Sequence, residues 1–258
     1  MAPMRFAIGS QKSGTTWLRD CFGHVCTVPK RGEWYFTELY ERITQHARLH
    51  NILPPERQKA IGERATAAAW KALLDEVEPG ATFDKSAYPC WGAVRNDLHP
   101  HAVRLAREVF PDACTVVIVR DPRAVFNSAL HYFSTTDSEW AGKIDPADFA
   151  ATWQTQNCQW IDDAPSVLVR YEDMKSNMHA ALTDVFSACR LPCDHDGVAR
   201  IVAVESDVAA ARERAPEPEQ RPIYRVGTTD DYLKHLSPET IKEIETAAAP
   251  LMARLGYL

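Results

Sequence analysis

The sequence has no apolar run of membrane-spanning length, since its longest uninterrupted stretches are comparable to residues 116–119. A helix that crosses a bilayer needs about 20 apolar residues. No charged-then-apolar leader opens the chain, because the first expected strand begins at Arg5. Positive charge is not in excess either: the net charge is −6, which argues against broad nucleic-acid binding. These absences predict a soluble, cytoplasmic protein with neither a membrane nor a nucleic acid as partner.

A disulfide framework is also not expected. The seven cysteines are odd in number and scattered, which favours reduced thiols when no secretory signal is present. Cys189, Cys193 and His195 form the one cluster with loosely metal-like spacing. Because a second pair of ligands is lacking there, we predict no metal site.

What the sequence does contain is an alternation of short apolar runs and segments with helical periodicity. The expected strands are 5–9, 82–84, 115–119 and 167–170, and the expected helices are 55–77, 101–110, 123–133, 146–161 and 238–255. Alternation of this kind predicts an α/β fold, with a central, mainly parallel sheet flanked by helices, in a single domain over residues 1–258. Residues 209–222 are charged and punctuated by proline, which predicts a mobile loop or lid.

Residues 9–16, G-S-Q-K-S-G-T-T, follow the first expected strand and open a helix. Such a loop is an anion cradle, because its N–H groups converge, the helix dipole favours negative charge and Lys12 adds a full positive charge. In a Walker A loop the lysine follows the last glycine, whereas Lys12 precedes Gly14 by two positions. The alternative to an anion-binding loop is a turn that contains these glycines by chance.

The loop resembles the 5′-phosphosulfate loop of sulfotransferases, which usually reads P-K-[SA]-G-T-[TS]-W-L. Residues 12–18 match this pattern, and Gln11 stands where the family often has proline. The resemblance implies a P-loop-like sulfotransferase fold and the donor 3′-phosphoadenosine 5′-phosphosulfate (PAPS), with 3′-phosphoadenosine 5′-phosphate (PAP) as product. The loop residues that it assigns to donor binding are Lys12, Ser13, Gly14, Thr15, Thr16 and Trp17.

A second motif, V-V-I-V-R-D-P-R-A-V-F-N-S over residues 116–128, ends a buried strand and starts a helix. By the same resemblance, Arg120 and Ser128 hold the 3′-phosphate of the donor, a role that suits the donor fork of arginine and a hydroxyl. Two alternatives remain open. Asp121 could be a magnesium ligand of the Walker B type, and Arg123 could pair with acidic neighbours on the surface.

A third match lies near the carboxyl end. Residues 223–237 align without gaps with the family pattern F-x-R-K-G-x-x-G-D-W-K-x-x-[FL]-[TS], which implies that Arg225 and the Gly227 backbone close over the 3′-phosphate. Val226 replaces a lysine and Asp230 a glycine, so donor affinity or loop geometry can differ from that of other members. The R-Y-E-D-M stretch at residues 170–174 also resembles the family, and we interpret it as structural.

The resemblance also implies a catalytic base, because residues 32–36, G-E-W-Y-F, resemble the K-E-x-x-[FY]-F-like motif of carbohydrate-type members. Ala87 stands where small-molecule sulfotransferases have their catalytic histidine, and residues 84–89 instead resemble carbohydrate-type members, whose base is a glutamate. By that resemblance Glu33 is the base, while Lys12 and Lys85 stabilise the leaving group. Aromatic neighbours would raise the pKa of a carboxyl at Glu33. The alternative for Glu33 is a cap of the following helix, and His24 and His131 are fallback bases.

The predicted reaction is a direct, in-line transfer of a sulfuryl group from PAPS to a hydroxyl of a small metabolite or sugar-like acceptor, with an amine as the less favoured acceptor. No metal is required by this scheme. The aromatic residues that could line the acceptor pocket, or belong to the core, are Trp34, Tyr35, Phe36, Tyr88 and Trp91. Two other functions are considered: a small-molecule or nucleoside kinase that uses ATP and magnesium, and a nucleotide-binding module without catalysis.

Overall fold

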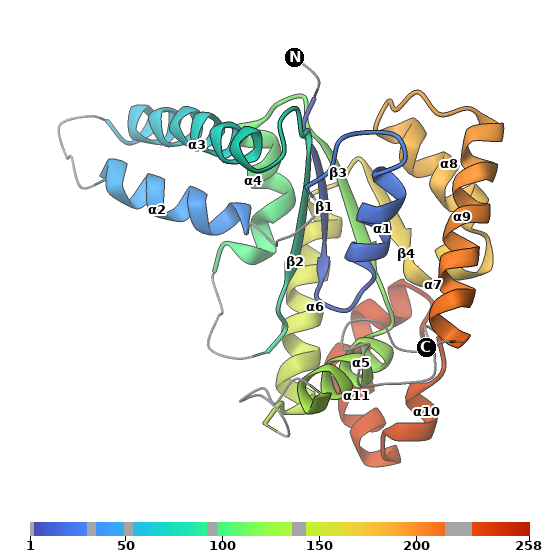
Figure 1. The fold of residues 1–258 in the computed structure, drawn as a ribbon. Helices are drawn as coiled ribbons and strands as arrows, with labels where there is room; N and C mark the ends of the chain where they lie inside the picture. The colour runs from blue at the N-terminus through green and yellow to red at the C-terminus, as the bar shows by residue number, and fades with distance from the viewer. Residues whose placement is uncertain (1–2, 30–34, 49–53, 92–96, 136–142, 215–228) are drawn as a thin grey trace.

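The computed structural model describes residues 3–29, 35–48, 54–91, 97–135, 143–214 and 229–258. Its centre is a sheet with the strand order β2-β1-β3-β4 (Figure 1). These strands are β1 (Arg5–Ser10), β2 (Phe83–Tyr88), β3 (Cys114–Val119) and β4 (Val167–Arg170). Every pairing is parallel, so the carboxyl ends of the strands meet at one edge of the sheet. The predicted parallel α/β architecture is therefore confirmed.

Strand β2 is longer than its sequence indicated. The expected strand ended at Asp84, but pairing continues to Tyr88, with Lys85 opposite Ala7 and Ser86 opposite Ile8. All six residues of β2 are buried, because helices cover both faces of the sheet. The polar residues at 84–86 hid this extension, since a buried parallel strand usually reads as a continuous apolar run. Lys85 consequently lies within the strand and not beyond its end.

Helices cover both faces of this sheet. On one face lie α1 (Thr15–Phe22), α8 (Met178–Ala188) and α9 (His195–Arg214), with the short α7 (Tyr171–Ser176) directly after β4 (Figure 1). The ring of Phe22 in α1 packs on Phe83 of β2 and Phe186 of α8, with centroids 4.7 and 5.5 Å away. On the other face lie α4 (Ala102–Val109), the 3₁₀ turn η1 (His99–His101) and α6 (Pro146–Asp162).

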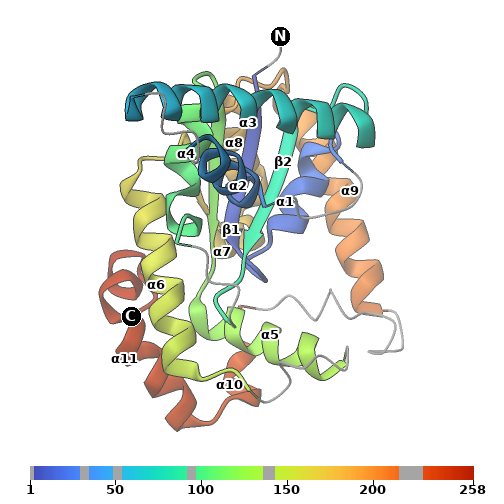
Figure 2. The same ribbon diagram turned by 90° about the vertical axis from the view of Figure 1, so that its left-hand side faces the viewer.

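The hairpin of α2 (Phe36–Arg48) and α3 (Pro55–Val77) packs outside α4 (Figures 1 and 2). A third group of helices lies at the carboxyl edge of the sheet: α5 (Pro122–Thr135), α10 (Tyr232–His235) and α11 (Pro238–Arg254) (Figure 1). Phe126, Phe149 and Leu251 belong to the buried core between α5, α6 and α11. The site at the strand ends therefore rests against this third group.

Local signals placed several helices correctly. Helix α3 has the predicted bounds, and α11 starts at Pro238, where the Ser237 hydroxyl accepts a hydrogen bond of 3.2 Å from the Thr240 N–H. Asp145 caps α6 in the same way, through the Asp148 N–H at 2.8 Å. Serine or aspartate followed by proline therefore begins both helices.

Two sequence expectations are corrected. Helix α9 continues to Arg214, so residues 209–214 are helical although their composition predicted a loop; residues 215–222 lie outside the described residues. Cys114 and Cys189 form a disulfide between the start of β3 and the end of α8, whereas reduced thiols were expected. The pairing depends on tertiary structure, since these cysteines are 75 residues apart in the sequence.

Within the described ranges, every helix is too short or too polar to cross a bilayer.

Candidate functional site

The loop after β1 has a backbone shape that suits an anion. Lys12 and Gly14 both have positive φ values, 70° and 101°, on either side of Ser13. The buried Ser13 hydroxyl donates to the Ser10 carbonyl at 2.6 Å, which closes the turn. Helix α1 then begins without a side-chain cap. An uncapped helix N-terminus at the end of such a loop favours negative charge.

Gly14 has a steric role as well. A Cβ atom built at Gly14 would lie 2.6 Å from the ring of Tyr171, which no real side chain tolerates. Only glycine allows both this contact and the left-handed conformation at low cost. The loop therefore packs tightly against the first residue of α7.

The two predicted leaving-group lysines reach the same region from different elements. The Lys85 ammonium crosses from β2 to α1 and donates to the Thr16 hydroxyl at 3.3 Å. The Lys12 ammonium lies 3.4 Å from the centroid of the Tyr132 ring in α5. The structure thus brings Lys12, Lys85 and the first turn of α1 to one edge of the sheet. Tyr132 was missed by the sequence analysis because no motif marks it, although it lies one helical turn after Ser128.

Arg120 follows β3 and contacts the loop directly. Its guanidinium donates to the Lys12 carbonyl at 3.1 Å and lies 4.2 Å from the ring centroid of Tyr171. Arg120 is 8% exposed, so its charged group is surrounded by protein rather than by water. Tyr171 also packs edge-on against Trp17, with centroids 5.7 Å apart. The two motifs that were predicted to bind opposite ends of one nucleotide therefore meet on the Tyr171 ring.

Asp121 caps helix α5, and its charge is paired with Arg123. One carboxylate oxygen accepts from the Arg123 N–H at 2.9 Å, and both accept from the guanidinium, at 2.6 to 3.2 Å. This pairing favours the ion-pair alternative for Arg123 and leaves the Walker B alternative for Asp121 without support. Among the residues that the structure describes, no three His, Cys, Asp or Glu side chains gather as they would around a metal ion.

The aromatic candidates divide into surface-proximal and core residues. Tyr35 is half-buried, and its hydroxyl accepts a hydrogen bond of 2.9 Å from Gln11 of the loop. Phe36 and Tyr88 are 1% exposed and Trp91 is 7% exposed, each within a core cluster. Burial of this degree favours the core alternative for Phe36, Tyr88 and Trp91. Tyr35 contacts the loop through its side chain, whereas Tyr88 contacts it through its backbone carbonyl, which accepts from the Gln11 N–H at 2.9 Å.

His99 is a buried neighbour of this cluster that no motif pointed to. Its ring centroid lies 4.6 Å from Tyr88 and 6.4 Å from Tyr35, and the side chain is inaccessible to solvent. Burial lowers the pKa of His99 to about 4. The imidazole is therefore neutral at neutral pH.

The remaining predicted residues are placed as follows. Glu33, Trp34, Arg225 and Gly227 lie outside the described residues. The fallback base His24 lies after the carboxyl end of α1, opposite the loop, where its ring pairs with Glu205 at 3.1 Å. This position removes it from the candidate site. His131 is adjacent to Tyr132 on α5, and Ser128 is half-buried on the same helix.

The structure is thus an α/β protein with a parallel sheet, and its candidate anion site lies where Lys12 of the loop, Lys85 of β2 and Arg120 approach the uncapped start of α1. A family model described as "Sulfotransferase family" matches residues 3–196. The chain therefore belongs to the sulfotransferase family. No curated protein sequence matches it.

Solved structures of sulfotransferases share the fold. Mouse sulfotransferase SULT7A1 complexed with PAP has a TM-score of 0.59 and 15% identity, covering 98% of this chain and 84% of that one. The sulfotransferase domain of the Synechococcus PCC 7002 olefin synthase has a TM-score of 0.54 and 19% identity, covering 95% and 94%. Retinol dehydratase in complex with androsterone and the inactive cofactor PAP has a TM-score of 0.52 and 14% identity, covering 96% of this chain and 80% of that one. At these identities the likeness establishes the fold alone.

Proposed function

We propose that this protein transfers a sulfuryl group from PAPS to a hydroxyl of a small-molecule acceptor. The observation that carries the proposal is the contact between Arg120 and the phosphate loop, through the Lys12 carbonyl and the shared Tyr171 ring. A nucleotide with phosphates at both its 5′ and 3′ positions matches two cationic groups joined in this way. Two structural neighbours are complexes with PAP, which supports the same donor for this chain.

The residues present fit the donor. The loop from Lys12 to Thr16, with its uncapped helix N-terminus, would hold the 5′ end, and Arg120 and Ser128 would hold the 3′-phosphate. Arg225 and Gly227 are proposed to complete the 3′ end, and Trp17, which packs on Tyr171, to contact the nucleoside. When bound, PAPS supplies the activated sulfuryl group. Lys12 and Lys85 stabilise negative charge on the 5′ side, because preformed cations in a partly dry site act more strongly than in water.

Glu33 is proposed to accept the proton of the acceptor hydroxyl, so that the acceptor oxygen can bond to sulfur. Tyr35, two residues later, accepts a hydrogen bond from Gln11, so the start of α2 lies beside the loop after β1. Tyr35 has a φ of 42°, and bulky residues held in that left-handed region gather at functional sites. These two features support a base from this segment.

For the acceptor we propose a small molecule that carries a hydroxyl group. Retinol dehydratase was crystallised with androsterone, a small hydroxylated molecule, and this supports a small-molecule acceptor here. Sugars and polyols are included because of the glutamate-type motif around Glu33. A cytoplasmic location is likewise proposed from the sequence.

The decisive experiment measures nucleotide binding and transfer with purified protein. Isothermal titration with PAP in the presence of EDTA is expected to give saturable binding, and labelled PAPS is expected to modify hydroxylated acceptors from a panel. Glu33→Gln is expected to lower kcat by about 10²- to 10⁴-fold with PAP affinity retained. Full activity in Glu33→Gln would disprove the base assignment.

The other functions give different results. Binding of ATP–magnesium without binding of PAP would favour a kinase. PAP binding without transfer to any acceptor, unchanged in Glu33→Gln and Lys85→Ala, would indicate a nucleotide-binding module.

A further inference from the structure

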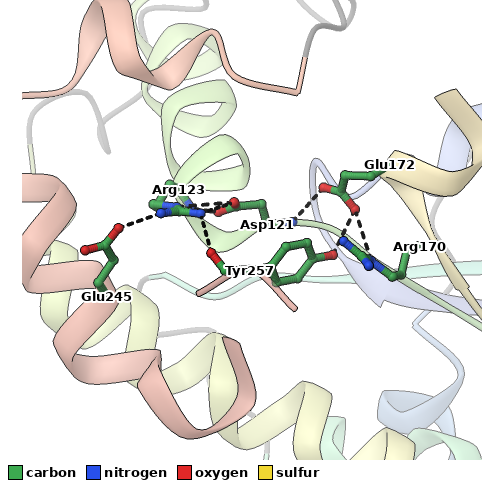
Figure 3. A network of polar contacts seen from close by, with 6 residues as sticks. All are labelled: Asp121, Arg123, Arg170, Glu172, Glu245 and Tyr257. Atoms are coloured by element: carbon green, nitrogen blue, oxygen red, sulfur yellow. Dashed lines mark hydrogen bonds and ion pairs between the residues drawn. The ribbon is translucent and has the colours of Figure 1, made fainter. Parts of the chain in front are cut away.

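The carboxyl end of the chain turns back toward the Arg120 motif. Helix α11 ends in a left-handed turn at Gly256, with a φ of 72°. The Tyr257 N–H donates to the Met252 carbonyl at 2.9 Å, five residues earlier, as in a Schellman turn. This turn directs Tyr257 away from the helix axis and onto the junction of β4 and α7 (Figure 3).

Tyr257 makes contacts on two sides of that junction. Its hydroxyl donates to a carboxylate oxygen of Glu172 at 2.8 Å, and its backbone carbonyl accepts from the Arg123 guanidinium at 2.9 Å (Figure 3). The guanidinium of Arg170 lies 4.7 Å from the ring centroid. Burial and the neighbouring Glu172 carboxylate raise the pKa of Tyr257 above its usual range. The hydroxyl therefore stays protonated and remains a donor.

Glu172 links Tyr257 to the peptide that follows Arg120. One of its oxygens accepts from Tyr257, and the other accepts from the Asp121 N–H at 3.0 Å. That N–H belongs to the peptide bond between Arg120 and Asp121, so the carboxylate fixes the backbone from which the Arg120 side chain starts. The Arg120 guanidinium also lies over the ring of Tyr171, which is the residue immediately before Glu172.

Arg123 makes the second link. Its guanidinium binds Asp121, Glu245 of α11 and the Tyr257 carbonyl (Figure 3). Asp121 is thus held at its N–H by Glu172 and at its carboxylate by Arg123. Both of these partners contact Tyr257.

We infer that Tyr257 is a positioning residue for the 3′-phosphate end of the donor site. It sets Arg120 through Glu172 and Arg123 without touching the nucleotide itself. This inference rests on the proposed function, because it requires that Arg120 binds the 3′-phosphate. Its consequence is specific: loss of the Tyr257 hydroxyl weakens recognition of the 3′-phosphate and leaves recognition of the 5′ end unchanged.

The test compares two nucleotides that differ only in that phosphate. Dissociation constants for PAP and for adenosine 5′-monophosphate are measured by isothermal titration on the wild type and on Tyr257→Phe. Loss of a hydrogen bond to a charged group is expected to raise the PAP constant by about three- to tenfold, with the constant for the monophosphate unchanged. A purely structural role would weaken both nucleotides alike and would overturn the inference, as would unchanged PAP affinity.

A matched control and a second variant complete the experiment. Arg254→Met breaks the exposed ion pair between Arg254 of α11 and Asp162 of α6, and it is expected to change neither dissociation constant. Glu172→Gln keeps an acceptor for the Asp121 N–H but offers an amide to Tyr257. If Tyr257 acts through Glu172, the double variant Glu172→Gln/Tyr257→Phe weakens PAP binding no more than the stronger of the two single variants. A double variant whose loss of PAP affinity equals the product of the two single losses contradicts the link.

Failure of the proposed function looks different. Wild-type protein that binds neither PAP nor PAPS overturns the proposed function, and this inference with it. Tight PAP binding by the wild type and equally tight binding by Tyr257→Phe overturns this inference alone.

Discussion

The turn of the phosphate loop is closed by residues close to one another in sequence, whereas the Arg120 segment is held by residues far from it. In the loop, Ser13 bonds to Ser10 three positions earlier, and Lys12 and Gly14 supply the two left-handed turns. Arg120 and Asp121 are held instead by Lys12 and Glu172, which are 108 and 51 residues away in sequence. One end of the site is encoded locally, and the other is assembled by the fold.

This difference predicts how the two ends respond to substitution. A change in the loop acts directly on the groups that face an anion. A change around Arg120 acts through packing and ion pairs, so its effect is smaller and is shared with stability. Tyr171 is where the two ends meet, since it contacts Gly14 on one side and the Arg120 guanidinium on the other.

The largest effect is expected at Lys85 on the loop side. Lys85→Met removes a buried cation that contacts Thr16, while the methionine still fills the space. We expect kcat for sulfuryl transfer to fall by about 10²- to 10³-fold, because the charge acts on the leaving group in the transition state. The measurement is steady-state kinetics with PAPS at a saturating acceptor concentration.

Lys175→Met is the control for charge alone. Lys175 is exposed on α7, with its ammonium 6.0 Å from the Trp17 ring, so kcat is expected to stay near that of the wild type. An equal loss in both variants would show that Lys85 contributes only general positive charge.

Gly14→Ala tests the contact between the two ends. The added Cβ would meet the Tyr171 ring at 2.6 Å in a backbone conformation with a φ of 101°. We expect the free energy of unfolding in urea to fall by about 3 kcal/mol, from the left-handed conformation and the clash together. Gly80→Ala separates the two causes, because Gly80 has a φ of 81° and no atom within 4 Å of the added Cβ.

For Gly80→Ala the expected loss is about 1 kcal/mol, the conformational part alone. Equal losses of unfolding free energy at the two glycines would mean that the Tyr171 ring moves aside freely. The inference that the loop packs tightly against Tyr171 would then be wrong.

Asp121→Asn weakens the assembled end without removing its helix cap. Asparagine still accepts the Arg123 N–H as an N-cap, but the half-buried guanidinium loses one of its two carboxylate partners. We expect a loss of about 2 kcal/mol in the free energy of unfolding. Asp145→Asn is the matched control at the exposed cap of α6, where about 0.5 kcal/mol or less is expected. Similar losses of unfolding free energy at both caps would mean that the Asp121–Arg123 ion pair contributes nothing beyond the helix cap.

The same contrast explains what could be read from the sequence. The strand, loop and helix around Lys12 were predictable because a left-handed glycine, a small-residue turn and an apolar run each leave a local signal. The helices at Pro122, Pro146 and Pro238 start within one residue of the starts expected from periodicity, and each has proline in its first position after an aspartate or a serine. The roles of Lys12 and Arg120 were predicted by resemblance, and the structure brings both residues together.

Features that depend on distant contacts were not predictable. Nothing in the sequence near Tyr132 shows that the lysine of the loop after β1 will lie over its ring, and nothing near Tyr257 indicates Glu172. The disulfide between Cys114 and Cys189 was missed for the same reason, since pairing follows from the placement of β3 against α8. In β2, polar residues concealed the four strand positions from Lys85 to Tyr88, because the burial of this strand comes from helices on both faces.

The smallest expected effect concerns His99, which packs beside Tyr35 and Tyr88 behind the loop. Burial lowers the pKa of His99 to about 4, whereas an unfolded histidine titrates near pH 6.5. The unfolded chain therefore binds a proton first as the pH falls, and the stability present above about pH 6.5 is lost progressively toward pH 4. We expect the free energy of unfolding to drop by about 1.5 kcal/mol between pH 7 and pH 5 from this group.

His99→Phe keeps a ring against both tyrosines but cannot be protonated, so its urea midpoint should vary less over that range. If His99→Phe keeps the wild-type pH dependence, the loop side is not supported by a buried neutral imidazole, and its stability depends on local geometry alone.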